Sequence, residues 1–287
     1  ITEKIVSERK EHLKFIQTFP VEEKLVQRLK SQNLGRRKQP SESLMFRKKF
    51  DSKGKKVETN LGAGGFSIHL GSTSKDFPKF KHNLPEIALA GHTNSGKSTL
   101  INALAGIHPR RGPAGVSDRA GWTDFVSFYQ IGKKPPVLTL VDLPGYGHAV
   151  ASKSMQKEWK NMIKGYLDGN RKQLCRCCVL VDCTRGLTED DDIILAYLEK
   201  KRIEHQVVLT MCDLLGAERL AQCVSALQNE LKLRDSRHMT DPSIIPVCGH
   251  TGAGVTALWE ELKGRSLKER GSLIAQQKYL RQIKTTK

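Results

Sequence analysis

The sequence lacks any long uncharged apolar run. No segment approaches the roughly 20 apolar residues that a membrane-spanning helix needs, so we expect a soluble protein with no membrane partner. An initiator methionine is also lacking, because the chain begins at Ile1, and we expect the native N-terminus to lie further upstream. Five glutamates within residues 3–23 are unlike a targeting peptide, which is poor in acidic residues. A presequence upstream of Ile1 stays an open alternative.

A cysteine pattern suited to disulfides or zinc is missing as well. The seven cysteines are an odd number, and most lie in apolar, strand-like segments, which indicates reduced thiols in an intracellular compartment. Cys175 and Cys178 have the C-x-x-C spacing, but no second pair completes a zinc site. We therefore interpret them as buried strand cysteines, with metal binding as the alternative.

Acidic residues are scarce at both ends of the chain. Residues 1–84 carry 19 Lys/Arg against 9 Asp/Glu, a charge of +10, and residues 264–287 carry 7 against 1, a charge of +6. Residues 85–263 carry 22 against 20, only +2 of the total +18. Such basic ends indicate a polyanion partner, most commonly nucleic acid, whereas lysines that serve only solubility are the alternative. Basic clusters interleaved with aromatic residues at 35–56 suit an extended arm on RNA.

A glycine-bounded loop of the type G-x-x-x-x-G-K-[ST] spans Gly91 to Ser98. It follows an apolar run and opens into a segment with helical spacing, which is the context of a phosphate-binding loop rather than a chance glycine loop. Backbone N–H groups and the helix N-terminus converge there on phosphate oxygens. Lys97 supplies a cation for the outer phosphates, and the Ser98 hydroxyl is a magnesium ligand. We assign nucleotide binding to Asn94, Ser95, Gly96, Lys97, Ser98 and Thr99.

Two further segments fit a nucleotide sensor. Residues 107–124 form a polar, glycine-rich stretch that resembles a switch loop and holds one threonine, Thr123, before an apolar run. Two strand-like runs follow this stretch, and the second of them ends in Asp142-Leu143-Pro144-Gly145. In this D-x-x-G pattern the carboxylate of Asp142 holds magnesium through water, and the N–H of Gly145 meets the γ-phosphate.

Apolar runs alternate with helical segments along residues 85–263. The expected strands are residues 87–90, 125–131, 137–141, 177–181, 206–210 and 244–247. This alternation predicts an α/β fold with a mainly parallel six-stranded sheet and helices on both faces. Each of the motifs follows a strand, and ligands of such sheets bind at the carboxyl ends of the strands.

A base-reading motif, Thr210-x-x-Asp213, closes the fifth of these strands. The Asp213 carboxylate can accept two hydrogen bonds from guanine, whereas adenine presents an acceptor to it, so this residue selects GTP over ATP. Cys248 and Gly249 follow the last strand.

With these motifs in order, residues 85–263 resemble the EngB/YihA (YsxC) family of GTPases, which act in assembly of the large ribosomal subunit. The matching segments are Leu84 to Ala88, the phosphate loop, Leu100-Ile101-Asn102, Gly121-x-Thr123, Asp142 to Gly147, Val181-Asp182 and Leu209 to Asp213. The most specific piece is D-L-P-G-Y-G at Asp142 to Gly147. The resemblance covers about three-fifths of the chain, and residues 1–75 lie outside it.

The resemblance implies a P-loop GTPase that binds GTP or GDP with Mg²⁺. It assigns Ser98 and Thr123 to the magnesium ion with Asp142 behind a water molecule, and Lys97, Thr123 and Gly145 to catalysis. Asn94 stands where related GTPases without a catalytic glutamine place a potassium ligand. Tyr146 stands where signalling GTPases carry glutamine, so we expect slow intrinsic hydrolysis that a partner stimulates by ordering the switches.

Three positions depart from the family pattern. Trp122 replaces an arginine of the switch, Met211 replaces the lysine of T-K-x-D, and Cys248-Gly249 replaces Ser-Ala. A thioether chain can pack on the base much as a lysine stem does. In the place that the resemblance gives it, Gly249 still has the backbone N–H that would meet the guanine carbonyl. A weakened or nucleotide-locked GTPase is the alternative that these departures leave open.

We expect three parts: a basic N-terminal extension over residues 1–80 with a helical segment and an extended arm, a GTPase domain over 81–263, and a basic C-terminal helix or tail over 264–287. The expected function is assembly of the large ribosomal subunit in the mitochondrial matrix, or otherwise in the cytoplasm. The expected partners are large-subunit rRNA and ribosomal proteins or other assembly factors, with the protein a monomer on the particle. The alternatives are a non-hydrolysing RNA-binding scaffold and a signalling switch, although lipidation cysteines are absent from the C-terminal residues.

Overall fold

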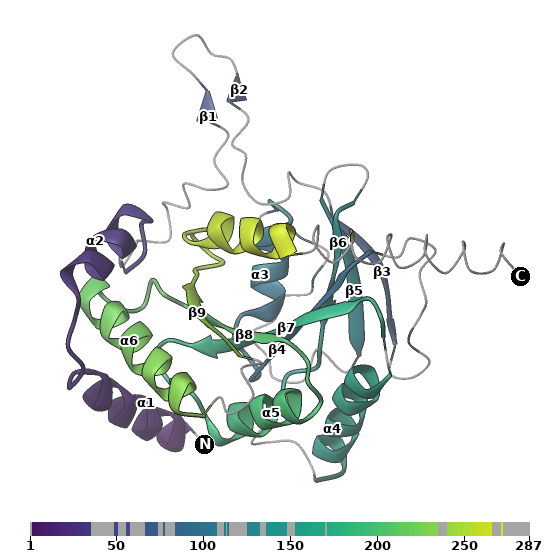
Figure 1. Cartoon of the computed structure of the whole chain (residues 1–287), viewed down its shortest axis with the longest axis horizontal. Helices are drawn as coiled ribbons and strands as arrows, with labels where there is room; N and C mark the ends of the chain where they lie inside the picture. The colour runs from purple at the N-terminus through teal and green to yellow at the C-terminus, as the bar shows by residue number, and fades with distance from the viewer. Residues whose placement is uncertain are drawn as a thin grey trace, which may run out of the picture.

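The computed structural model describes residues 2–35, 49–50, 56–57, 67–73, 77, 84–107, 112, 114, 125–132, 136–147, 153–169, 171–234, 240–265 and 271. Its centre is a sheet with the strand order β3-β5-β6-β4-β7-β8-β9 (Figure 1). The strands are β3 (Ser67–Thr73), β4 (Glu86–Gly91), β5 (Val126–Ile131), β6 (Leu138–Asp142), β7 (Leu174–Asp182), β8 (His205–Thr210) and β9 (Thr240–Pro246).

The sheet is mainly parallel, as the sequence predicts. Strands β6, β4, β7, β8 and β9 pair in parallel, whereas β5 pairs antiparallel with β6. The six expected strands are present, and β3 adds a seventh by pairing antiparallel with the free edge of β5. Two short strands of the expected arm, β1 (Lys49–Phe50) and β2 (Lys56–Val57), pair only with each other. The remaining residues of that arm, from 36 to 60, lie outside the described ranges.

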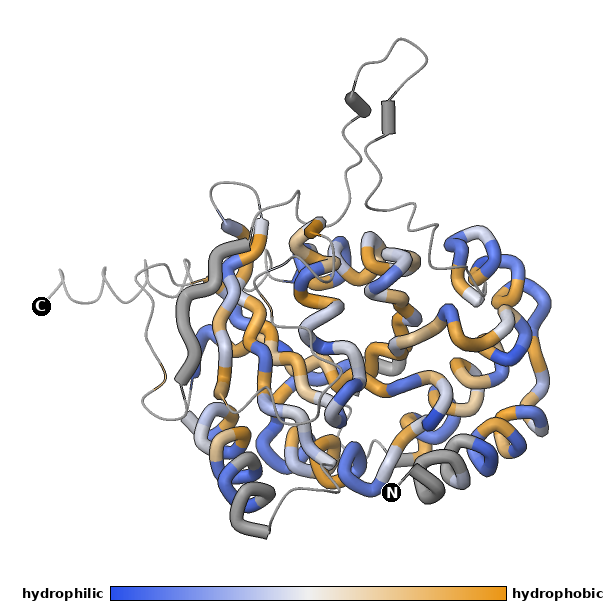
Figure 2. Tube along the Cα trace, turned by 180° about the vertical axis from the view of Figure 1, so that it is seen from behind, coloured by the Kyte–Doolittle hydropathy of each residue, from blue (hydrophilic) through white to orange (hydrophobic). Residues whose placement is uncertain are grey.

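Helices cover both faces of the sheet because its central strands are apolar on both sides. In β4, Ile87 and Leu89 point to one buried cluster with α3 (Lys97–Leu104) and the final helix, residues 255–265. Ala88 and Ala90 point to the other cluster, with α4 (Lys153–Asp168), α5 (Glu189–Lys200) and α6 (Ala217–Arg234). Figure 2 shows the apolar residues concentrated along the strands.

The two N-terminal helices, α1 (Thr2–Ile16) and α2 (Glu23–Ser31), lie along α6 (Figure 1). The chain leaves the first helix before Pro20, and the second helix turns its apolar residues Val26 and Leu29 inward. Ile16 and Leu29 are fully buried and belong to the same cluster as α6. Helices from the expected N-terminal extension therefore contribute to the core that packs on the sheet.

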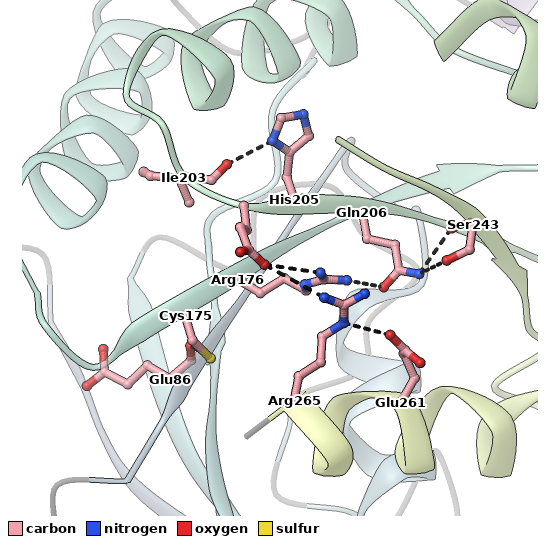
Figure 3. Close-up of polar contacts among 10 residues, drawn as sticks. Glu86, Cys175, Arg176, Ile203, His205, Gln206, Ser243, Glu261 and Arg265 are labelled. Carbon is pink, nitrogen blue, oxygen red and sulfur yellow. Dashed lines mark hydrogen bonds and ion pairs between the residues drawn. The ribbon is translucent and has the colours of Figure 1, made fainter. Parts of the chain in front are cut away.

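A polar network joins the amino ends of β7, β8 and β9 to the final helix (Figure 3). The buried Arg176 donates to Gln206 at 2.9 Å, and Gln206 donates in turn to the Ser243 hydroxyl at 2.8 Å. Arg176 and Arg265 both pair with the carboxylate of Glu204, at 3.3 and 3.8 Å. This network fixes the end of the final helix at the edge of the sheet opposite the nucleotide motifs.

All seven cysteines carry free thiols, and six of them are buried. Cys175 and Cys178 both lie on β7, so the interpretation as buried strand cysteines is confirmed for Cys178, whereas Cys175 is only partly buried. Among the described residues, no His, Cys, Asp or Glu groups of three or more are placed to hold a metal ion. In the same ranges, no helix is long and apolar enough to cross a membrane.

Candidate nucleotide-binding site

The phosphate-loop motif forms a tight turn between β4 and α3. Gly96 caps α3 with φ +89°, and Asn94 also has a positive φ, of +64°. A Cβ on Gly91 would lie 2.6 Å from the Ser95 hydroxyl and 2.8 Å from the Leu180 carbonyl oxygen, so only glycine fits there. The loop therefore presents the N-terminus of α3, with its partial positive charge, beyond the carboxyl end of β4.

The side chain of Lys97 lies against the backbone of this loop. Its ammonium group donates to the carbonyl oxygens of Gly91 at 3.0 Å and His92 at 3.2 Å. Burial lowers the pKa of Lys97, and the nearby charge of Asp142 opposes that shift. A buried cation with two neutral acceptors is well placed to exchange them for charged phosphate oxygens.

Ser98 and Asp142 meet because β4 and β6 are neighbours. The Ser98 hydroxyl donates to Asp142 Oδ2 at 3.3 Å. Burial raises the pKa of Asp142 to about 6, against the opposing effects of Lys97 and the Ser98 hydrogen bond. Asp142 Oδ1 and the Ser95 hydroxyl, both buried, make no hydrogen bond within the described part of the chain.

Buried polar atoms without a partner in the protein indicate a ligand site. A hydroxyl next to a carboxylate is an oxygen donor set that suits Mg²⁺, and the unpartnered Asp142 oxygen fits this assignment. Bound magnesium would offset negative charge on the phosphates. Thr123, the other expected magnesium ligand, lies outside the described residues, as does Trp122.

The D-x-x-G segment lies directly against the phosphate loop. A Cβ on Gly145 would approach Lys97 Nζ to 3.1 Å and the Thr93 hydroxyl to 2.9 Å, so a side chain there would crowd the phosphate side of the site. The backbone N–H and the hydroxyl of Thr93 both donate to the Tyr146 carbonyl, at 2.8 and 3.2 Å. The structure thus brings together Lys97, Ser98, Asp142 and Gly145.

Tyr146 points away from the phosphates and into the core. Its hydroxyl donates to Asp191 Oδ1 at 2.6 Å, and both residues are buried. The other Asp191 oxygen accepts from the backbone N–H and hydroxyl of Thr188, which caps α5. Burial and the adjacent Asp191 raise the pKa of the Tyr146 phenol, so it remains a donor. Sequence reasoning missed Asp191, whose only local signal is the capping pattern T-x-x-D.

The base-reading motif follows β8 and meets the loop after β9. The Cys248 thiol donates to Asp213 Oδ1 at 3.0 Å, and burial raises the pKa of this thiol to about 11, so it keeps its proton. The Thr210 hydroxyl donates to the Val181 carbonyl at 3.1 Å and joins β8 to β7. Gly249 lies against α3, since a Cβ there would be 2.9 Å from Thr99 Cγ2. The base and phosphate loops therefore border one site.

A phosphate loop, a D-x-x-G segment and a guanine-reading aspartate at the carboxyl edge of one parallel sheet define a P-loop GTPase. Residues 86–211 match the family model described as "50S ribosome-binding GTPase". The chain is 36% identical over 183 residues to the "Probable GTP-binding protein EngB" of Rhodospirillum rubrum, covering 63% of this chain and 76% of that protein. It is 38% identical over 173 residues to the EngB protein of Rhodopseudomonas palustris strain BisB18, covering 60% of this chain and 76% of that protein.

The chain belongs to the EngB family of GTPases. Membership implies that it binds GTP or GDP with Mg²⁺ and hydrolyses GTP. Among solved structures, it is similar to that of a probable GTP-binding protein EngB, with a TM-score of 0.48 and 24% identity, covering 64% of this chain and 97% of that one.

Proposed function

We propose that this GTPase acts in assembly of the large ribosomal subunit and binds precursor rRNA through its basic ends. The observation that carries the proposal is the separation of charge, with +16 of the total +18 at residues 1–84 and 264–287. A polyanion such as rRNA matches these ends, and a nearly neutral GTPase domain is free to respond to nucleotide. The family description, which names binding to the 50S ribosome, supports the same partner.

The N-terminal charge divides between two segments that the structure distinguishes. Helices α1 and α2, within residues 2–35, carry 7 Lys/Arg against 5 Asp/Glu and pack in the core. Residues 36–60 carry 9 against 3, a charge of +6 in a shorter stretch. We therefore assign RNA contact to residues 36–60. Deleting residues 1–60 would also remove α1 and α2 from the core, so neutralising side chains is the better test.

The test compares two matched variants. The arm variant changes four cations of this segment to glutamine: Arg36, Arg37, Lys38 and Arg47. The control variant changes four exposed cations of the packed helices to glutamine: Lys10, Lys14, Lys24 and Lys30. Binding to large-subunit precursor rRNA is measured as a function of salt, together with the affinity for GDP.

Each phosphate contact adds about 0.7–0.9 to the log–log salt slope, so the arm variant should flatten that slope by about 3. The control should keep the parent's slope, and both should keep the parent's GDP affinity. An arm variant with the parent's slope would show that the arm is a solvated tail or a protein-docking segment.

We further propose that the protein works in the mitochondrial matrix, as a monomer on the assembling particle, and that its slow hydrolysis is accelerated there. The basic additions to an EngB domain and the divergent base site favour an organellar member. Cell fractionation with RNA and protein identification tests the compartment and the partners. Single-turnover GTP hydrolysis with and without the particle tests the enzyme, and the absence of turnover in both would favour the non-hydrolysing scaffold.

Potassium is proposed as a second cation, bound by the exposed amide of Asn94. Hydrolysis on the particle should then be faster in potassium than in sodium. The residue has φ +64°, where glycine is tolerated without strain, so Asn94→Gly removes the amide and preserves the loop. This variant should hydrolyse GTP at the same rate in both salts. Equal rates for the parent in both salts would exclude the potassium role.

A further inference from the structure

The N-terminal helices reach the guanine-reading loop. Residues 2–35, called the N-terminal hairpin below, consist of α1, a turn near Pro20, α2 and the residues that follow it, and each of the two helices contacts α6 (Figure 1). The Gln222 amide of α6 donates to the Gln17 carbonyl at 3.5 Å, and Ile16 and Leu29 are fully buried. The family model begins at residue 86, so this hairpin lies outside the matched region.

The end of the hairpin makes a direct contact with the base loop. The N–H of Gly35 donates to the carbonyl oxygen of Cys212 at 3.2 Å, one residue before Asp213. Leu34 is buried in the same cluster as Cys212 and Ala217. Gly35 has φ +70°, and a Cβ there would lie 2.5 Å from both the Cα and the N of Ala217. The position therefore accepts only glycine without rearrangement.

The base loop needs such support because its backbone is strained. Met211, which is not glycine, has φ +57°. Backbone in this region persists where the surroundings hold it in place. The Cys183 thiol donates to the Met211 carbonyl at 3.1 Å, and the Cys212 N–H donates to the Val247 carbonyl at 3.3 Å. Contacts from the residues directly after β7 and β9 and from the hairpin thus hold successive residues of the loop.

We propose that the N-terminal hairpin positions the guanine-reading loop, with Gly35 as the positioning residue and Asp213 as the group it serves. Cys212 is fully buried, so water cannot easily replace the N–H of Gly35 at its carbonyl oxygen. Displacing the hairpin end lets the Cys212 peptide rotate, and the Asp213 carboxylate then loses its alignment with the base. The hairpin sets guanine selectivity as well as stability.

The test measures the dissociation constants of GDP and inosine diphosphate for the full chain. Inosine diphosphate lacks the 2-amino group, so the ratio of the two constants reports the second hydrogen bond to Asp213. Gly35→Ala and the milder Leu34→Ala disturb the hairpin end. Val26→Ala, which removes buried side-chain volume from α2 and leaves Leu34 and Gly35 unchanged, controls for lost stability. Thermal melting confirms that each variant is folded at the temperature of the assay.

We expect the two hairpin-end variants to weaken GDP binding by about three- to tenfold, the equilibrium equivalent of one backbone hydrogen bond. Their inosine-to-guanine ratio should move toward one, and Val26→Ala should keep the parent's ratio with a lower melting temperature. If Gly35→Ala does not fold, Leu34→Ala alone decides. A parent-like ratio in the folded hairpin-end variants, or an equal change in Val26→Ala, would overturn the proposal.

Discussion

Tyr146→Phe removes one hydroxyl and tests the link between the D-x-x-G segment and α5. The lost hydrogen bond joins Tyr146, 5% exposed, to Asp191, 2% exposed, at 2.6 Å. Water has little access to replace it, and a hydrogen bond to a carboxylate contributes about 1.5–3 kcal/mol to stability. The carbonyl of Tyr146 also accepts from Thr93, so loosening this residue loosens the contact of Gly145 with the phosphate loop. We expect weaker GTP binding relative to GDP, because the γ-phosphate is what the N–H of Gly145 meets.

Tyr166→Phe is the matched control, since its buried phenol also donates to a carboxylate, that of Glu86, at 2.9 Å. Glu86 keeps two further hydrogen bonds from Arg171, at 2.6 and 2.7 Å, and lies at the start of β4, away from the phosphates. Tyr166→Phe should lower the free energy of unfolding in urea by less, about 0.5–1.5 kcal/mol. It should leave the ratio of GTP to GDP affinity unchanged. A Tyr146→Phe protein with the parent's midpoint of urea denaturation and the parent's ratio of GTP to GDP affinity would refute this role of the hydrogen bond.

Three other perturbations act on the same site. Lys97→Ala should abolish GTP binding or hydrolysis without lowering the melting temperature, because it removes a buried cation, and parent-like GTP affinity would contradict the assignment. Asp142 has a pKa of about 6 in the folded protein against 3.8 as its ordinary value, so the nucleotide-free protein should lose stability as pH rises from about 4 to about 6 and stay level above that. That loss of stability amounts to about 3 kcal/mol at neutral pH, so Asp142→Asn should be more stable than the parent in urea above pH 6. Because Asp142 is an expected magnesium residue, the same variant should lose the magnesium dependence of nucleotide binding. Asp213→Asn should move preference from guanine toward xanthine nucleotides in competition assays, because its amide can donate to the added carbonyl, and an unchanged preference would exclude the base-reading role.

The parts of the site that can be predicted from sequence are those with a local signature. The loop from Gly91 to Ser98 needs fixed residue types at fixed spacing, so the residue pattern alone places its strand, turn and helix. The buried parallel strands are apolar on both faces and therefore stand out as short apolar runs. The shared carboxyl edge of the sheet then explains why Ser98 and Asp142 meet.

The contacts that sequence reasoning missed join residues far apart in the chain. The place of Tyr146 after the D-x-x-G glycine suggests a role at the phosphates, yet its position depends on Asp191, which is 45 residues away. The apolar stripe of α2 is visible in the sequence, but nothing in it identifies α6 as the surface it covers. Strand β3, residues 67–73, is absent from the expected strands, because it is a single edge strand directly after the glycine-rich residues 61–65, a composition typical of a linker.

The two departures at the base site can be understood together. The Cys248 thiol donates to Asp213, and a thiol is a weaker donor than the hydroxyl of the serine in the family pattern. Met211, which stands in place of the lysine of the family pattern, has a positive φ, and its carbonyl accepts a hydrogen bond from the Cys183 thiol. The contact from Gly35 adds a backbone hydrogen bond from outside the region that the family model matches, and under the positioning proposal this bond holds the loop that carries Asp213.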